Sequence, residues 1–554
     1  MADRVGRVRP TLWQWLAAVT SVPILVAAVR GVQRGHLAVG DNALIEIRAR
    51  DVLTAHHPWL GTWSSASISS GVDLNHPGPL LFDLLALPVR LLGAGPGMAL
   101  GVAALQIGVV WAIAFSASRV GGRAVVTIVM VCTAWFTWSI GSELLYDPWQ
   151  PNLLMLPFLL LLVLVWGTVA GRHGMLPWAV LVASFCVQTH LSYVFLAPAV
   201  LVVGAIAVAR RRDRRPLVLG LVVGLLAWSQ PLLEQLFGSG QGNLSRIAAS
   251  GGGGDGLRTG VSLGIRLVSG VVALPPWWGR SGMMDTIPVV GLTDTPTGPA
   301  VEVPGLAGLG VAAVALTVVV VAVVALGIGA SRHGDRVVAG GTVVVGVALA
   351  VATVTTVITP IDALGLSPHK MRWLWPIAVA LTAVLALGLG RLALRSFPDD
   401  RRQQVSRAVT PIGAGAVVLA AVATLPFHAH DAGPVANRSD IGRITVLVDQ
   451  LDVLRGRGLV RMDSSGLWFA EPFTAPVKAG LQRAGVPFVV PEEGLVRQMG
   501  ERRRDRGDAD LVVWVRAGEE ELVVPDGAER VAFAPGLTEV ERAELDGYES
   551  ELSA

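Results

Sequence analysis

Three acidic side chains lie close together near the start of the sequence, in a segment that is more polar than its surroundings. They are Asp41, Glu46 and Asp51, within HLAVGDNALIEIRARD (36–51). A carboxylate can act as a general base and take a proton from an attacking hydroxyl group. Asp41 also has a simple structural explanation as the N-cap of a helix, because Asp suits that position. The segment alone leaves both interpretations of Asp41 open, and Glu46 is a weaker candidate for the same base.

A second group of candidate residues carries positive charge. The segment SPHKMRWLW (367–375) contains His369, Lys370 and Arg372. Lys370 is one of only two lysines in the chain, the other being Lys478. Clustered cations suit a phosphate, whereas the alternative is a membrane anchor with Trp373 and Trp375 in an aromatic belt. We favour the first interpretation and predict a phosphate-binding site.

Other polar segments supply residues that could line the same site. These are Asn75 and His76 in GVDLNHPGPL (71–80), Glu143 and Asp147 in SELLYDPWQPN (142–152), and His190 in QTHLSY (188–193). Each residue has a structural alternative: hydrogen bonding in a turn, capping of a helix end, or packing of a lone histidine. Both cysteines, Cys132 and Cys186, lie within apolar runs, which argues against a disulfide framework and a Cys-based metal site. We predict no metal site and no cofactor, although a divalent cation is compatible with the sequence.

The composition is that of an integral membrane protein. Of 554 residues, 52% are hydrophobic and 15% are charged. Residues 12–30 are apolar over a length that can cross about 30 Å of hydrocarbon, and Arg4, Arg7 and Arg9 precede them. A cleavable signal peptide would leave many later apolar runs unexplained, so we expect a retained helix with a cytoplasmic N-terminus. The net charge of +3 gives no indication of a nucleic-acid partner.

Further apolar runs bring the number of predicted spans to about eleven. They cover residues 97–117, 122–140, 151–170, 175–190, 193–209, 215–235, 304–329, 336–357, 372–392 and 408–426. Positively charged short loops stay in the cytoplasm, and arginines fall on alternate loops here: 118–123, 171–174, 209–215, 331–336 and 391–407. The pattern predicts an α-helical polytopic membrane protein with its N-terminus inside and its C-terminus outside.

One apolar run does not fit this alternation. PLLFDLLALPVRLLG (79–93) is short and contains Asp83, and counting it as a span would invert every later loop. We therefore expect an interfacial or re-entrant helix at the outer membrane surface. Residues 31–96 and 236–303 are the predicted outer regions with such helices, and 251–303, with an amphipathic helix near 257–273, is a candidate gate or lid.

From residue 427 the composition changes to that of a soluble domain. Ser439 and Asp440 are typical of a helix start, and apolar residues recur at helical spacing after them. Similar helical patterns lie at 474–485 and 537–552. Short β-type runs lie between them: GLVRM (458–462), PFVV (487–490), ADLVVWV (509–515) and RVAFA (530–534). We predict that residues 1–426 form a transmembrane catalytic domain and 427–554 a small extracytoplasmic α/β domain. It has no nucleotide-binding or nucleophile motif, which favours recognition over catalysis.

The order and sidedness of these segments resemble those of the GT-C superfamily of integral-membrane glycosyltransferases. The shared pattern covers about residues 1–426 and consists of an acidic first outer loop (GDNALIE), the segment HPGPLLFDLLALP, an acid-and-proline motif (YDPWQPN) and an outer cationic loop (PHKMRWLWP). One difference is that Asn42 follows Asp41, where protein O-mannosyltransferases have adjacent acids. A metal-dependent scheme or a protein acceptor is therefore not implied.

The resemblance implies roles for particular residues. Asp41 would be the catalytic acid of the first loop and act as general base, while Lys370 and Arg372, with His369, would hold the donor phosphate. Glu46, Asn75, His76, Glu143, Asp147 and His190 would line the active site. The donor would be a polyprenyl-phosphate sugar, the acceptor a cell-envelope glycan or glycolipid, and the site would face the extracytoplasmic side of a bacterial plasma membrane. The sugar is not specified, with arabinose and mannose as examples from the superfamily.

Two other functions are compatible with charges at helix ends. A lipid or glycolipid transporter would show internal repetition and helices broken near the bilayer middle, whereas the acids here cluster in loops. A non-catalytic envelope assembly protein would tolerate replacement of Asp41.

Overall fold

The protein is mostly helical in the computed structural model, with a small sheet near the C-terminus. The structure describes residues 11–211, 213–238, 240–250, 257–274, 293–295, 298–300, 305–361, 365–366, 368–425, 440–467, 471–517, 524–536, 543 and 547–548. The glycine-rich start of the candidate lid (251–256), most of the lid beyond residue 274 and nearly all of the predicted helix 537–552 lie outside this description.

Eight helical stretches within the described part are long and apolar enough to cross a membrane. They are α1 (Leu12–Gln33), α5 (Ala94–Ile140), α6 (Gln150–Leu153) with α7 (Met155–Val169), the 3-10 turn η3 (Leu191–Tyr193) with α9 (Leu196–Ala209), α14 (Leu309–Arg332), α15 (Arg336–Ile358), α16 (Leu374–Arg395) and α17 (Asp399–Thr424). A ninth is possible where α10 (Arg215–Ala227) and α11 (Ser229–Phe237) join at a 54° bend. The polytopic helical class is confirmed, while the count of about eleven spans stays a prediction.

The longest helix, α5, contains a break. A straight helix of 47 residues would be about 70 Å long, more than twice the roughly 30 Å hydrocarbon core. Gly121 and Gly122 have non-helical backbone angles, and Gly122 has a φ of 68°, which glycine adopts without steric cost. The break falls within the predicted loop 118–123, so the two apolar runs expected on either side are both present.

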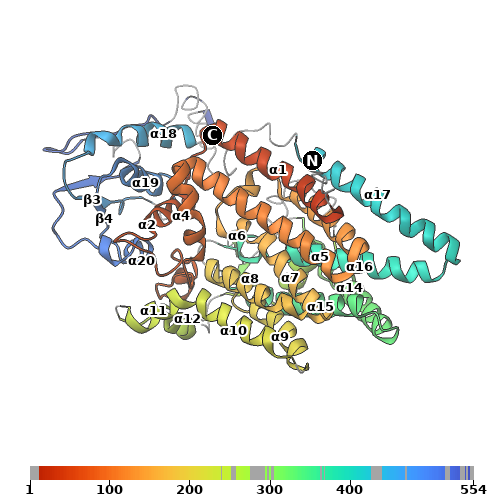
Figure 1. Ribbon diagram of the computed structural model, residues 1–554. Helices are drawn as coiled ribbons and strands as arrows, with labels where there is room; N and C mark the ends of the chain where they lie inside the picture. Colours follow the sequence, from red (N-terminus) through yellow and green to blue (C-terminus); the bar gives the residue numbers. More distant parts are fainter. Residues whose placement is uncertain are drawn as a thin grey trace, which may run out of the picture.

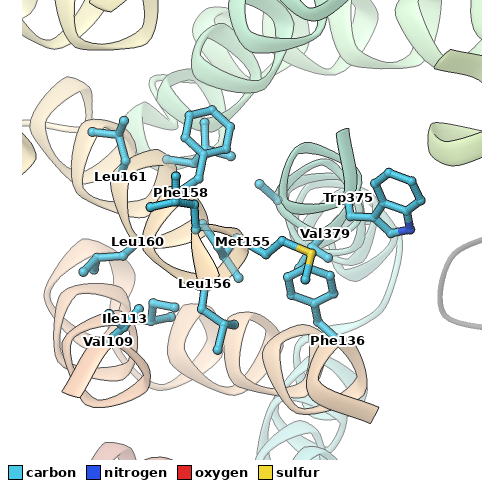
Figure 2. Close-up of a cluster of buried hydrophobic side chains, with 14 of the residues drawn as sticks. Val109, Ile113, Phe136, Met155, Leu156, Phe158, Leu160, Leu161, Trp375 and Val379 are labelled. Carbon is cyan, nitrogen blue, oxygen red and sulfur yellow. The ribbon is translucent and has the colours of Figure 1, made fainter. Parts of the chain in front are cut away.

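Helix α7 forms the centre of the membrane part. Nearly all its residues are buried, as expected for a helix that is apolar on every side. Figure 2 shows Met155 of α7 beside Phe136 of α5 and Val379 of α16. The described residues of α14 are mostly exposed, which is the environment of a lipid-facing helix.

Loops that carry arginines meet at one end of the bundle. Arg391 pairs with Asp335 at 2.6 Å, and the indole N–H of Trp166 donates to the carbonyl of Val337 at 2.7 Å. Arg391 lies near the last residue of α16, whereas Arg372 lies just before its first residue. Helix α16 has 22 residues and is about 33 Å long. The predicted cytoplasmic loops 331–336 and 391–407 are therefore separated from the candidate cationic site by the thickness of the bundle.

The outer segments contain short helices that pack on the bundle. The first are α2 (Asp41–Asp51), α3 (Ala66–Ser70) and α4 (Leu80–Leu92), and α4 lies against α5 and α2. The others are α12 (Asn243–Ser250) and α13 (Gly260–Val272), with a strand pair β1 (Thr293–Thr295) and β2 (Gly298–Ala300). Helix α8 (Leu176–Thr189) instead lies against α7, α9 and α10, and the span predicted at 175–190 stays a prediction. The helices expected at 79–93 and 257–273 are thus present, and their interfacial position stays a prediction.

The C-terminal unit is an α/β fold with a three-stranded parallel sheet in the order β4-β3-β5. Its elements are α18 (Ile441–Asp449), β3 (Val460–Asp463), α19 (Thr474–Ala484), β4 (Phe488–Val489), α20 (Glu493–Met499), the 3-10 turn η10 (Glu501–Arg503) and β5 (Leu511–Trp514). The strand expected at 530–534 is wrong, because those residues form no strand in the described structure. The predicted boundary near 427 falls in 426–439, outside the described residues.

This C-terminal unit packs directly on α2. Ala43 and Ile47 of α2 belong to the same buried cluster as Val477 and Leu481 of α19. Figure 1 shows α19, β3, β4 and α20 gathered beside α2 and α4 at one end of the molecule. Helix α2 is therefore enclosed by α4 on one side and by the C-terminal unit on another.

The contact between α4 and α5 gives a test of this packing. A Cβ added at Gly97 of α5 would overlap the backbone of Pro88 and Val89 in α4, whereas one added at Gly108 of the same helix would meet nothing within 4 Å. We expect Gly97→Ala to lower the free energy of unfolding by about 1–3 kcal/mol and Gly108→Ala to leave it unchanged or slightly raised. Thermal unfolding in detergent measures both, and equal midpoints would contradict the α4–α5 packing.

Candidate functional site

Asp41 is the first residue of α2. The N-cap is Gly40, with a φ of 56°, so the interpretation of Asp41 as an N-cap is wrong. Its Oδ2 accepts a hydrogen bond from the indole N–H of Trp149 at 3.0 Å. Among the described residues its Oδ1 accepts no hydrogen bond, and the side chain is exposed. One carboxylate oxygen of Asp41 is therefore available to a bound molecule.

Asp147 is buried and its carboxylate is fully engaged. Oδ1 accepts from the side-chain amide of Asn42 at 2.7 Å and from the backbone N–H of Trp149 at 3.1 Å, and Oδ2 accepts from Asn152 at 2.8 Å. The bond from the backbone N–H two residues later is an Asx turn, a local pattern that Asp favours. Asp147 thus joins α2 to the loop before α6 and has a structural role in this site.

Burial raises the pKa of both carboxylates, and the charge of Asp41 also acts on Asp147. Burial by surrounding protein atoms raises the pKa of Asp41, and the hydrogen bond from Trp149 partly offsets this rise. The side chain of Asp41 is nevertheless exposed to solvent. Burial also raises the pKa of Asp147, opposed by its hydrogen bonds and reinforced by the nearby charge of Asp41. A raised pKa brings a carboxylate closer to the range in which a general base is effective.

Arg372 supplies a buried positive charge. Burial lowers its pKa to about 10, and the charge of Asp147 acts in the opposite direction, so the guanidinium remains a cation at neutral pH. It lies 5.3 Å from the ring centroid of Trp375. Trp373 and Trp375 are themselves buried, so the alternative of a lipid-facing aromatic belt is wrong. Lys370 is directed toward the carbonyls of Pro360 and Gly365, at 3.3 and 3.4 Å.

Three histidines come together beside these groups. The rings of His76 and His190 are 4.7 Å apart, and His369 packs edge-on against Trp149 at 5.4 Å. Nδ1 of His76 accepts from the backbone N–H of Leu191 at 3.1 Å. Burial, followed by the charges of Lys370 and Arg372, lowers the pKa of His369 to about 3. His369 is therefore neutral at pH 7, which corrects its predicted contribution as a cation and leaves it a hydrogen-bonding role.

Two residues expected in the site, Glu46 and Asn75, contact the C-terminal unit instead, and the position of Glu143 in the site stays a prediction. The carboxylate of Glu46 is completely buried and faces Arg483 of the C-terminal unit at 3.4 Å. Asn75 donates to the carbonyl of Gly61 at 3.0 Å and accepts from Nε of Arg497 at 3.0 Å. Glu143 accepts a hydrogen bond from its neighbour Ser142 at 3.2 Å. The structure therefore places Glu46 and Asn75 at the contact with the C-terminal unit.

The sequence interpretation missed residues that hold the acids in place. Asn42, Trp149 and Asn152 each bond to Asp41 or Asp147. Two of the three lie in the motif YDPWQPN, so the motif itself was the available signal. Among the described residues, no group of three or more His, Cys, Asp or Glu side chains is arranged to hold a metal ion.

Comparisons with known proteins give a structural likeness. No protein-family model and no curated protein matches the sequence. The structure is similar to that of ArnT from Cupriavidus metallidurans bound to undecaprenyl phosphate, with a TM-score of 0.51 and 15% identity over 88% of this chain and 89% of that chain. It also matches the apo Archaeoglobus fulgidus oligosaccharyltransferase, with a TM-score of 0.39 and 11% identity over 86% and 64% of the chains. The likeness to ArnT shows the GT-C fold that the motifs predicted.

The hydrogen bonds of Asp147 make its replacement costly. In Asp147→Asn the new amide N–H groups would oppose at least one existing donor, and the charge near Arg372 would be lost. We expect the free energy of unfolding to fall by about 1–3 kcal/mol. Asp41→Asn keeps an oxygen that can accept the single exposed hydrogen bond from Trp149, so it should change the free energy of unfolding much less. Thermal unfolding of both purified variants measures the difference, and equally stable variants would refute the structural role of Asp147.

Proposed function

We propose that this chain, which has the GT-C fold, is a membrane glycosyltransferase with Asp41 as its general base. It transfers a sugar from a polyprenyl-phosphate donor to a glycan or glycolipid acceptor of the cell envelope. The observation that carries the proposal is the carboxylate of Asp41: one oxygen is fixed by Trp149 and the other is available. Its charge acts on Asp147, whose own charge acts on the buried Arg372. The fold is also that of ArnT, which was solved with undecaprenyl phosphate bound.

The proposed reaction is a single displacement at the anomeric carbon of the donor sugar. Asp41 takes the proton of the acceptor hydroxyl as its oxygen forms a bond to the anomeric carbon. The bond between that carbon and the phosphate oxygen breaks, and its electron pair leaves with the polyprenyl phosphate. Because a phosphate is a good leaving group, the enzyme needs a base, cations for the departing charge and correct positioning.

The phosphate would be held by Arg372, with Lys370 nearby. Arg372 is charged at neutral pH despite its burial, and a guanidinium in a dry environment interacts strongly with phosphate oxygens. The neutral imidazoles of His76, His190 and His369 would hydrogen-bond uncharged hydroxyl groups of the sugar without adding charge. This division assigns the phosphate to the arginine and the sugar to the histidines.

The proposed location is the extracytoplasmic face of a bacterial plasma membrane. The arginine-bearing loops 331–336 and 391–407 lie at the end of the bundle remote from Arg372. Because such loops favour the cytoplasmic side, the site falls on the opposite side. A polyprenyl-phosphate sugar in the outer leaflet is a donor that would be available there.

Replacement of Asp41 tests the base directly. We expect Asp41→Asn to lower kcat/KM by about 100- to 10,000-fold, the usual contribution of a general base, with normal folding. The assay uses purified protein in liposomes with radiolabelled polyprenyl-phosphate sugars and envelope acceptors. Asp73→Asn is a matched control, because Asp73 also accepts from a tryptophan indole, that of Trp63 at 2.8 Å, outside the site. Equal transfer by Asp41→Asn and wild type would exclude Asp41 as the base.

The pH profile gives an independent test. A base acts when deprotonated, so activity falls as the pH drops through its pKa. Because the pKa of Asp41 is raised, the acidic limb of kcat/KM should lie above the range of an ordinary aspartate. The indole of Trp149 stabilises the anion, so Trp149→Phe should move this limb to higher pH. Trp63→Phe should leave it in place, and an unchanged limb in Trp149→Phe would disprove the assignment.

A further inference from the structure

We propose that the C-terminal α/β unit positions Asp41 by holding the far end of α2, with Asp51 and Arg503 as positioning residues. The inference rests on the proposed function for its effect on activity. The geometry behind it concerns α2 alone: Asp41 is the first residue of this helix and Asp51 is the last.

Asp51 is the centre of a buried charge network between α2 and the C-terminal unit. Arg503 donates to both of its carboxylate oxygens, at 2.6 and 2.8 Å. Arg48 donates at 2.8 Å and Gln482 at 2.8 Å. Asp51, Arg48 and Arg503 are at most 5% exposed. A two-pronged arginine–carboxylate contact fixes orientation as well as distance.

Other contacts also hold the last turns of α2 against the C-terminal unit. Nη1 of Arg48 donates to the carbonyl of Met499 at 2.6 Å, and Gln482 donates to the carbonyl of Ile47 at 3.3 Å. Arg483 pairs with the buried Glu46 at 3.4 Å. The C-terminal unit thus contacts side chains and backbone over the last turns of α2, while Asp41 at the first turn contacts Trp149 of the membrane part.

Buried ion pairs are a poor means of gaining stability, since desolvation offsets the attraction and apolar residues often do as well. Their best-supported use is to fix one arrangement among several. Asp41 and Asp51 are about 15 Å apart along the helix axis. A tilt of about 5° at the Asp51 end would move Asp41 by roughly 1 Å, and a misplacement of that size can cost about 100-fold in rate.

Arg503→Met tests the inference, with Arg504→Met as the matched control. Arg504 is the next residue, and it pairs instead with the exposed Glu493 and Glu501 at 2.7 and 2.5 Å. We expect Arg503→Met to lower kcat about 10- to 100-fold with little change in KM, and Arg504→Met to leave both unchanged. Arg503→Lys, which restores the charge without the two-pronged contact, should recover part of the loss.

A double variant separates positioning from general stability. If Arg503 acts through Asp41, the residual activity of Asp41→Asn should not fall further when Arg503→Met is added. Additive losses would overturn the inference. Asp51→Asn is the second variant should Arg503→Met fail to fold.

Hydrogen–deuterium exchange gives a readout that does not depend on any substrate. Amides of residues 41–51 should exchange faster in Arg503→Met than in wild type or Arg504→Met, while those of α7 stay protected. Unchanged exchange in α2 would overturn the inference. If α2 exchanges faster but the wild type transfers no sugar, the proposed function is refuted. The conclusion that the C-terminal unit holds α2 in place would still stand.

Discussion

The site depends on one buried carboxylate, that of Asp147. Its oxygens accept from Asn42 of α2, from Asn152 of α6 and from the backbone N–H of Trp149. Its negative charge also supports the positive charge of the buried Arg372. A buried charge is tolerated only when it is paired and hydrogen-bonded, so these segments have little freedom to separate. Trp149 is fixed by the same network, and its indole orients Asp41.

Asp147 and Asp41 therefore have different roles in the site. Both oxygens of Asp147 accept hydrogen bonds from the surrounding protein, whereas Asp41 retains an oxygen for an incoming molecule. Helix α2 connects this arrangement to the C-terminal unit, because its other end carries Asp51 and the contact with Arg503. The C-terminal unit, which has no catalytic motif, thus has a structural connection to the helix that carries Asp41.

Sequence alone was sufficient for the class of fold, and it also grouped several residues that the structure brings together. Hydropathy, the arginine-bearing loops and short-range patterns depend on local sequence, and they placed Asp41, Asp147 and Arg372 on one face before their contacts were known. Helical geometry could also have separated Glu46 from Asp41, since five residues correspond to about 140° around the axis. The pairing of Asp51 with Arg503 had no such signal, because it joins residues 452 positions apart.

The charge state of the histidines was equally inaccessible to sequence. His369 stands beside Lys370 and Arg372, and three adjacent basic residues suggest a cationic patch. Burial and the repulsion of its two neighbours instead lower the pKa of His369 and keep its ring neutral. Burial also lowers the pKa of Arg372, and the nearby charge of Asp147 opposes this change. In the proposed function, the charged guanidinium of Arg372 binds the phosphate, and the neutral imidazoles are suited to the uncharged sugar of the donor.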